Sequence, residues 1–293
     1  MKKGLNIRII PKLDIKGPNL VKGIHLEGLR VLGKPEDFAR HYYQMGADEL
    51  IYIDVVASLY NRNSLHEIIS RTAKEIFIPM TVGGGLRTID DIKSVLRAGA
   101  DKVSLNTAAI KNPDIIKEAA TIFGSSTITI AIEAIKQPTG EYLAYTDNGR
   151  EFTGIEVLGW AKRAESLGAG EILLTSIDRE GTGKGYDLEL VKRIASAVSI
   201  PVIACGGAGT LEHIHEVIEK SEADAVAIAS MLHYDFVTKN QSSSEYTGEG
   251  NTEFLKRKTE IFGKINNIDL NTIKKYLFHH GIPCRYKEIA LFP

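Results

Sequence analysis

Residues 80–89 read Met-Thr-Val-Gly-Gly-Gly-Leu-Arg-Thr-Ile, and residues 202–211, which begin 122 positions later, read Val-Ile-Ala-Cys-Gly-Gly-Ala-Gly-Thr-Leu. Two further pairs of segments recur at nearly the same spacing: 47–52 with 169–174, and 100–107 with 223–230. A repeat of about 120 residues is too long for a solenoid unit, but it is the size of half an eight-stranded barrel of about 250 residues. The repeat therefore predicts a barrel made of two similar halves.

The composition narrows the class of protein. The chain has 293 residues, a formal net charge of −1 and an estimated pI of 6.7, so it shows no basic surface for nucleic acid. Two cysteines are too few for a disulfide framework or a zinc site. The N-terminus lacks the apolar core of a signal peptide, and no run approaches the ~18 apolar residues of a membrane span. We expect a soluble cytoplasmic protein without metal or cofactor.

Short apolar runs alternate with amphipathic segments, which is typical of βαβ units. The pattern predicts a single (β/α)8 TIM-barrel domain over residues 1–293, with half-barrels at about 1–124 and 125–293. An open doubly wound sheet would share the alternation, but the internal repeat and the strand count favour a closed barrel. We expect strands near 7–14, 49–55, 77–83, 102–106, 126–134, 170–177, 200–205 and 225–229. We expect helices near 35–46, 63–75, 88–98, 112–123, 154–167, 187–197, 210–220 and 269–280.

One segment departs from this rhythm, from about Asp235 to Asn266. It is polar, and it contains a possible charged helix over 252–262. Long connections of this kind are uncommon inside a domain unless they are functional or disordered. We interpret it as an insertion after the eighth strand, over the catalytic end of the barrel, or simply as a disordered surface segment.

Two carboxylates end equivalent strands of the two halves. Asp14 ends the first strand and Glu133 ends the fifth, 119 residues later. In a closed barrel these strands face each other, and catalytic groups of such barrels lie at strand ends. Opposed carboxylates can divide general acid and general base work when their environments separate their pKa values. Either residue alone could also be a simple strand cap.

Glycine-rich turns at the repeat spacing form a second candidate site. Glycine lets backbone N–H groups approach an anion, and the start of a following helix favours negative charge. A single glycine run is often only a turn, but two copies, each followed by a hydroxyl residue after the next strand, predict two phosphate sites. The first comprises Gly83, Gly84 and Gly85 with Asn106 and Thr107; the second comprises Gly206 and Gly207 with Ala229 and Ser230.

Charged residues also open several strands at the opposite end. Arg8 begins the first strand, and Glu49, Lys102 and Glu171 begin the second, fourth and sixth. If all four point inward, they form a layer of two cations and two anions across the barrel floor, because buried charges are costly unless paired. The functional interpretation is a polar gate into the barrel; the alternative is that some of these side chains point into solvent.

Taken together, these residues resemble the cyclase subunit of imidazole glycerol phosphate synthase, from Arg8 to about Val237 and again from Ile268 to Arg285. The most specific matches are Ile9-Ile10-Pro11-x-Leu13-Asp14, residues 81–85, residues 106–109 and residues 168–179. In that family the barrel receives ammonia from a separate glutaminase that docks on its floor. At the mouth, ammonia reacts with a bisphosphorylated ribulosyl aminoimidazole carboxamide, and an imidazole product is released.

The resemblance implies roles for individual residues. Asp14 would be the general acid/base, and Asp101 would help to hold the glutaminase. Lys22, on a mobile first loop, would close over the substrate. The gate would comprise Arg8, Glu49, Lys102 and Glu171; one phosphate would bind at Gly85, Asn106 and Thr107, and the other at Gly181, Gly207, Ala229 and Ser230.

Three departures from the family lie near the chemistry. Glu133 replaces an aspartate, Lys12 replaces a cysteine in the middle of the first strand, and the 235–266 insertion is added. A lysine inside the barrel needs a partner, for which Asp14 and Glu133 are candidates. Because of these departures, the histidine-pathway cyclase is one of three functions that we consider. The second is a paralogue that supplies ammonia for amidation of an N-acetyl sugar in surface-polysaccharide biosynthesis. The third is a non-catalytic barrel that docks and activates a glutaminase.

Overall fold

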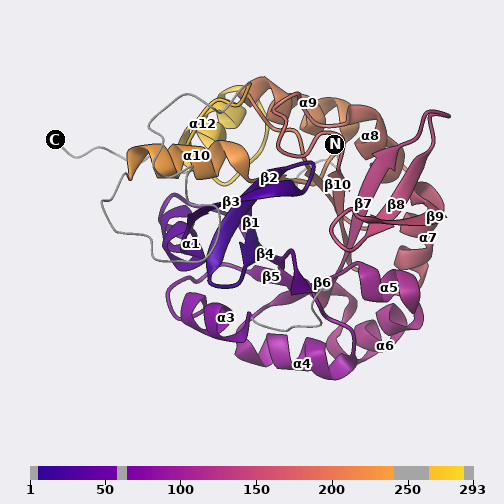
Figure 1. The fold of residues 1–293 in the computed structure, drawn as a ribbon. Helices are drawn as coiled ribbons and strands as arrows, with labels where there is room; N and C mark the ends of the chain where they lie inside the picture. Colours follow the sequence, from indigo (N-terminus) through magenta and orange to yellow (C-terminus); the bar gives the residue numbers. More distant parts are fainter. Residues whose placement is uncertain (1–5, 58–64, 241–263, 287–293) are drawn as a thin grey trace.

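Eight parallel strands form a closed barrel (Figure 1) in the computed structural model, which describes residues 6–57, 65–240 and 264–286. Each strand pairs with the next in the set, and the circle closes where β12 pairs with β1. This confirms the predicted (β/α)8 barrel, and all eight predicted strands are present. They are β1 (Arg8–Lys16), β4 (Leu50–Asp54), β5 (Met80–Gly83), β6 (Lys102–Leu105), β7 (Ile128–Lys136), β10 (Glu171–Ser176), β11 (Val202–Cys205) and β12 (Ala225–Ile228).

Helices surround the barrel (Figure 1), and two of them begin with equivalent threonine caps in the two halves. Thr88 caps α4 (Ile89–Ala98) by accepting from the N–H of Asp91. Thr210, 122 positions later, caps α9 (Leu211–Ser221) by accepting from the N–H of His213. The eight predicted helices are confirmed as α1 (Pro35–Gln44), α3 (His66–Thr72), α4 (Ile89–Ala98), α6 (Asp114–Phe123), α7 (Val157–Ser166), α8 (Leu188–Ala195), α9 (Leu211–Ser221) and α12 (Leu270–His279). Three further elements were not predicted from the sequence: α5 (Thr107–Lys111), the 3-10 turn η1 (Ser125–Thr127) and α10 (Ser230–Lys239). None of the described helices is long and apolar enough to cross a membrane.

Side chains alternate between the helices and the barrel interior, as the two-residue period of a strand requires. The interior contains a small apolar cluster that includes Ile10, Ile51, Leu173 and Ile203, each almost completely buried. The much larger outer cluster packs the strands against the helices. The apolar interior cluster lies between polar residues at both ends of the barrel.

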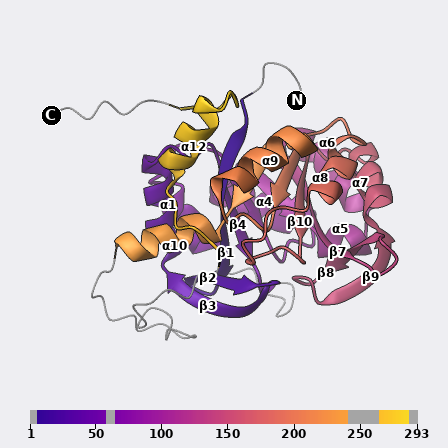
Figure 2. The ribbon, with the colours of Figure 1, turned by 90° about the horizontal axis from the view of Figure 1, so that it is seen from above.

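Two antiparallel hairpins extend from the barrel, and the sequence analysis predicted neither. β1 continues into β2 (Asn19–Ile24) and β3 (Glu27–Gly33), and β7 continues into β8 (Tyr142–Thr146) and β9 (Glu151–Glu156). Figure 2 shows both hairpins at the same end of the barrel. The turn signals Gly17-Pro18 and Pro138-Thr139-Gly140 could have revealed them.

The predicted insertion begins too early in the chain, because its first residues belong to helix α10 (Ser230–Lys239). Asp235 is buried and helical, because α10 continues to Lys239 and the two side chains form an ion pair of 2.9 Å across one helical turn. At the other end, the N–H of Asn266 donates to the backbone oxygen of Gly209. The predicted charged helix over 252–262 lies outside the described residues.

His233 fastens α10 to the barrel. Its Nε2 lies 3.0 Å from the backbone oxygen of Lys12, and its Nδ1 lies 2.6 Å from the hydroxyl of Tyr42 on α1. A carbonyl only accepts, so Nε2 carries the proton and Nδ1 accepts from Tyr42. Burial lowers the pKa of His233 to about 3, with the charge of Lys22 acting in the same direction. The imidazole is therefore neutral, and it holds β1 directly behind Lys12.

This neutral histidine predicts a loss of stability in mild acid. Its pKa is lower in the folded chain than in the unfolded chain, so the unfolded state binds more protons below about pH 6.5. The contribution is present above that pH and is lost as the pH falls. Between about pH 6.5 and 4.5 it amounts to roughly 2–3 kcal/mol of unfolding free energy.

Urea unfolding across that pH range measures the effect. His233→Gln should flatten the stability profile by this amount, whereas His279→Gln, on an exposed part of α12, should leave the wild-type slope unchanged. An identical slope in His233→Gln and wild type would show that His233 is not the residue responsible.

Candidate active site

Asp14 and Glu133 lie on strands at opposite positions of the barrel circle, β1 and β7. Both face the interior, at the end that carries the two hairpins. Their partners differ. Asp14 is contacted by ammonium groups, whereas Glu133 accepts a hydrogen bond of 2.8 Å from the backbone N–H of Gly149, in the β8–β9 turn. The repeat thus supplies two carboxylates in unlike environments.

Asp14 belongs to a buried chain of ion pairs. Lys12 Nζ forms a close ion pair with Oδ1 of Asp14, and Lys22 Nζ lies 3.8 Å from Oδ2. Lys22 in turn forms a close ion pair with Glu180, in the loop after β10. All four side chains are buried, so two cations and two anions neutralise one another beside the mouth.

The structure decides between the two predicted partners of Lys12. Its ion-pair partner is Asp14, whereas Glu133, the other candidate, accepts from the Gly149 N–H and interacts with Lys12 only through its charge. Although burial opposes a positive charge, the Asp14 carboxylate raises the pKa of Lys12, which is therefore a permanent ammonium inside the barrel. The location predicted for Lys22 also needs correction, because Lys22 lies in strand β2 of the first hairpin and is only 2% exposed.

Glu133 is the carboxyl group that can change its protonation state near neutrality. Burial raises the pKa of Glu133 to about 7, although the Gly149 N–H and the charge of Lys12 both lower it. A carboxyl with such a pKa can donate or accept a proton at neutral pH, which is the range in which general acid–base catalysis works best.

The glycine turns have similar backbone geometry in both halves, with positive φ at each equivalent glycine. Gly84 and Gly206 have φ values of +99° and +93°, which favour glycine. A Cβ on Gly84 would lie 2.3 Å from the backbone oxygen of Asp54, and one on Gly206 would lie 2.7 Å from that of Ser176. Asp54 and Ser176 are themselves 122 positions apart. Gly85 and Gly207 follow, with φ of +71° and +108°.

The residues after the next strands also match. Asn106 has φ −129° and ψ −86°, and Ala229 has φ −120° and ψ −79°; each directly precedes a helix, which begins at Thr107 or Ser230. Thr107 exchanges hydrogen bonds with Asp147 in the β8–β9 turn. The Oδ1 atom of Asn106 is buried without a hydrogen-bond partner in the described part of the chain.

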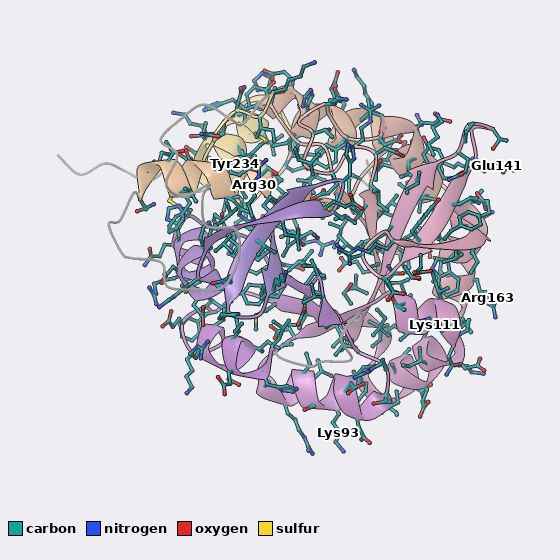
Figure 3. The ribbon with its side chains drawn as sticks, viewed as in Figure 1. Arg30, Lys93, Lys111, Glu141, Arg163 and Tyr234 are labelled. Carbon is teal, nitrogen blue, oxygen red and sulfur yellow. The ribbon has the colours of Figure 1, made fainter. Side chains whose placement is uncertain are left out.

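A cavity of about 170 Å³ brings part of the predicted site together. It is lined by Lys12, Glu133, Asn148 and Lys111 and by the first phosphate set except Gly83, that is, by Gly84, Gly85, Asn106 and Thr107. Figure 3 marks Lys111 on α5. Asp14, Lys22 and the second phosphate set, with Gly181, lie outside this cavity. A Cβ on Gly181 would lie only 2.5 Å from the backbone oxygen of Gly23, so the first hairpin covers that side.

Backbone and side-chain contacts hold the first hairpin over the mouth. The N–H of His25 donates to the backbone oxygen of Glu180, and Asn148 Nδ2 donates to that of Leu26. Further out, Arg30 of β3 and Tyr234 of α10 lie close to each other, and Figure 3 shows both where α10 meets the first hairpin. Sequence reasoning missed Glu180 and Asn148, although an Asp147-Asn148-Gly149 turn after a strand is a recognisable signal.

The barrel floor carries the layer of charges that the sequence predicted. Arg8 forms ion pairs of 2.8 Å with Glu49 and 2.5 Å with Glu171, and Lys102 pairs with the same two carboxylates at 3.0 and 3.3 Å. Although burial opposes its charge, these carboxylates raise the pKa of Arg8. A depression of about 390 Å³ on the outer side of the floor is lined by Arg8, Lys102 and Glu171. The ring is therefore reached from outside.

Asp101 lies at the same end of the barrel. Its Oδ2 accepts from the N–H of Met80 at 2.8 Å, so the side chain is oriented by the start of β5. Asp101 also lines a depression of about 360 Å³ beside Phe77, whose side chain is 80% exposed. A carboxylate and an aromatic ring are thus both presented on this face.

Comparisons with known proteins agree with this geometry. A family model described as histidine biosynthesis protein matches residues 8–238. An imidazole glycerol phosphate synthase subunit HisF from Legionella pneumophila is 60% identical over 210 residues, which cover 72% of this chain and 99% of the relative. HisF subunits from Prochlorococcus marinus and Methanopyrus kandleri are 50% and 48% identical, over 81% and 78% of this chain and 94% and 90% of the relatives. The chain therefore belongs to the histidine biosynthesis protein family and, within it, to the HisF enzymes, the cyclase subunits of imidazole glycerol phosphate synthase.

Proposed function

We propose that this chain takes ammonia through its floor ring and adds it, at the mouth, to a bisphosphorylated ribulosyl aminoimidazole carboxamide, from which an imidazole product is released. The observation that carries the proposal is the arrangement of one barrel interior between two charged ends. The floor ring of Arg8, Glu49, Lys102 and Glu171 lies at one end, and Asp14 and Glu133 lie at the other.

The floor ring suits a neutral, polar molecule. Each of its charges is paired, and the apolar residues above it, such as Ile10 and Ile51, give no partner to an ammonium ion. Ammonia carries no charge, so it can exchange hydrogen bonds with the ring without the cost of burying an ion. The ring would therefore admit ammonia and exclude ammonium.

At the mouth, ammonia adds to the ribulosyl carbonyl carbon, and the adduct then loses water to form an imine. A C–N bond forms and the C–O bond breaks. One group must accept a proton from nitrogen, and another must donate a proton to the departing hydroxyl. Asp14 and Glu133, on opposite strands, can supply these two functions.

The two glycine turns would hold the two phosphate groups of the substrate. Gly84, Gly85, Asn106 and Thr107 line the cavity next to Glu133, and the second set repeats their backbone geometry. Exposed N–H groups in such turns bind anions. Lys22 would reach a phosphate only after its ion pair with Glu180 opens, so substrate binding would displace the first hairpin.

A partner glutaminase would dock on the floor, around Asp101 and Phe77. A cation of the partner would pair with Asp101, and an apolar side chain would fill the depression beside Phe77, since buried aromatic contacts dominate interface energies. The neighbouring floor depression would then open into the glutaminase active site. The two alternative functions, sugar amidation and non-catalytic docking, gain no support from the relatives, all three of which are named as synthase subunits.

The first prediction concerns turnover with ammonium as the nitrogen donor. The purified chain should form the imidazole product from ammonium and the bisphosphate substrate, and Asp14→Asn should lower kcat by roughly 10²–10⁴-fold, the usual contribution of a general acid or base. Binding of the partner glutaminase, measured by calorimetry, should be unchanged in the variant. A wild-type chain without any turnover would contradict the proposed reaction.

The second prediction concerns the floor ring. Lys102→Met should uncouple glutamine hydrolysis in the glutaminase from synthesis in this chain. Glu49 and Glu171 would lose one of their two cations, and the disrupted ring would no longer pass ammonia into the barrel. The yield of imidazole product per glutamine hydrolysed should fall well below one half, while activity with added ammonium is largely retained. A full yield in Lys102→Met would show that ammonia does not pass the ring.

A further inference from the structure

Lys12 is an ammonium group in the barrel interior, where it lines one cavity together with Leu173, Thr175 and Glu133. It pairs in register with Ile51 of the neighbouring strand and is 5% exposed. The floor ring does not reach it, because those cations and carboxylates pair with one another at the other end of the barrel. The charge of Lys12 is available to the mouth alone.

The distribution of charge at the mouth is uneven. Lys12 and Lys22 both contact Asp14, and Lys22 also pairs with Glu180. Glu133 instead has a backbone N–H as its hydrogen-bond partner, and it forms no ion pair within the described parts of the chain. One carboxylate of the opposed pair is thus held between cations, whereas the other can take up a proton without losing an ion pair.

We propose that Lys12 is a positioning residue that holds the Asp14 carboxylate in an ion pair and sets the pH at which Glu133, which has no ion pair within the described residues, donates its proton. The division of roles rests on the proposed function, whereas the electrostatic effect of Lys12 on the two carboxyl groups does not. Lys12 need not touch the substrate; it acts through the side chain that it binds.

The proton balance follows from these two states. As ammonia adds, one proton passes from its nitrogen to the carbonyl oxygen, which becomes a hydroxyl. Asp14, as a carboxylate, accepts the second proton, which the nitrogen releases when the hydroxyl leaves and the imine forms. Glu133, as a carboxylic acid, donates its proton to the hydroxyl that leaves as water. After the step Asp14 is protonated and Glu133 is ionised, and proton exchange through the mouth restores both groups before the next turnover.

The charged and titratable groups around Asp14 and Glu133 determine how the protonation of Glu133 depends on pH. They are Lys12 and Asp14 of β1, Lys22 of β2, Asp147 and the Gly149 N–H of the β8–β9 turn, Glu180 after β10, Cys205 of β11 and His233 of α10. Two of them act on Glu133 in opposite directions. The charge of Lys12 lowers the pKa of Glu133, and the charge of Asp14 raises it. Removing either charge should therefore move the titration of Glu133 in a defined direction.

The test is a ¹³C NMR titration of the full chain with carboxyl-labelled glutamate, in which Glu133→Gln assigns the signal. Glu133 should titrate near pH 7 in wild type, at higher pH in Lys12→Met, and at lower pH in Asp14→Asn. Lys12→Arg keeps the charge and should stay close to wild type. Lys274→Met is the matched control, because Lys274 is another buried lysine in an ion pair, of 2.8 Å with Asp48, but at the far end of the barrel.

An unmoved Glu133 signal in both Lys12→Met and Asp14→Asn would overturn the proposal, as would an equal shift in Lys274→Met. If Lys12→Met does not fold, Lys12→Gln and Asp14→Asn provide the same comparison. The pH–rate profile tests the role in the reaction. The basic limb of kcat should move to higher pH in Lys12→Met, and kcat should fall roughly 10²-fold, as for a misplaced reacting group, with little change in KM.

The two claims fail separately. Shifted titrations in a chain that forms no imidazole product would support the effect of Lys12 and contradict the proposed function. Normal turnover with unshifted titrations would contradict the effect of Lys12 alone.

Discussion

Charges that lie inside a closed barrel must neutralise one another, and this constraint organises the whole molecule. The interior holds two neutral sets, each with two cations and two anions. Arg8 and Lys102 pair with Glu49 and Glu171 at the floor, and Lys12 and Lys22 pair with Asp14 and Glu180 beside the mouth. Between them, apolar side chains such as Ile10 and Leu173 separate the two sets. An ion that lost its hydration among these apolar side chains would incur a large cost that uncharged ammonia avoids.

The two halves of the barrel share their backbone arrangement, but the surroundings of their two carboxylates differ. The glycine turns and the residues that follow them have similar backbone angles in both halves, and a hairpin extends from β1 and from β7 alike. At the positions of the two opposed carboxylates the halves differ. Asp14 lies between two ammonium groups, whereas Glu133 has a backbone N–H and a raised pKa. A symmetric barrel would present two equivalent carboxylates. This one presents a carboxylate that is paired with ammonium groups and a carboxyl group whose pKa is raised.

The sequence predicted the barrel, its eight strands and the floor layer because these features depend on local periodicity and on the need to pair buried charges. Lys102 and Glu49 could be assigned to the same charged layer because each lies at the start of its strand. The two hairpins were missed because they add strands to the sheet at one end without altering the βα rhythm that signals the barrel. The partner of Lys12 also could not be predicted. Asp14 and Glu133 both lie within reach of the same interior, and the choice depends on the β8–β9 turn, which supplies the Gly149 N–H to Glu133.

The central claim is that nitrogen travels inside the barrel from the floor ring to the two carboxylates. It is tested most directly by supplying the complex of this chain and its glutaminase with ¹⁵N-amide glutamine, the bisphosphate substrate and an excess of unlabelled ammonium in the buffer. The ¹⁵N content of the imidazole product is then measured by mass spectrometry. We expect the product to carry undiluted ¹⁵N. A product whose label is diluted to the isotopic composition of the bulk ammonium would contradict the account.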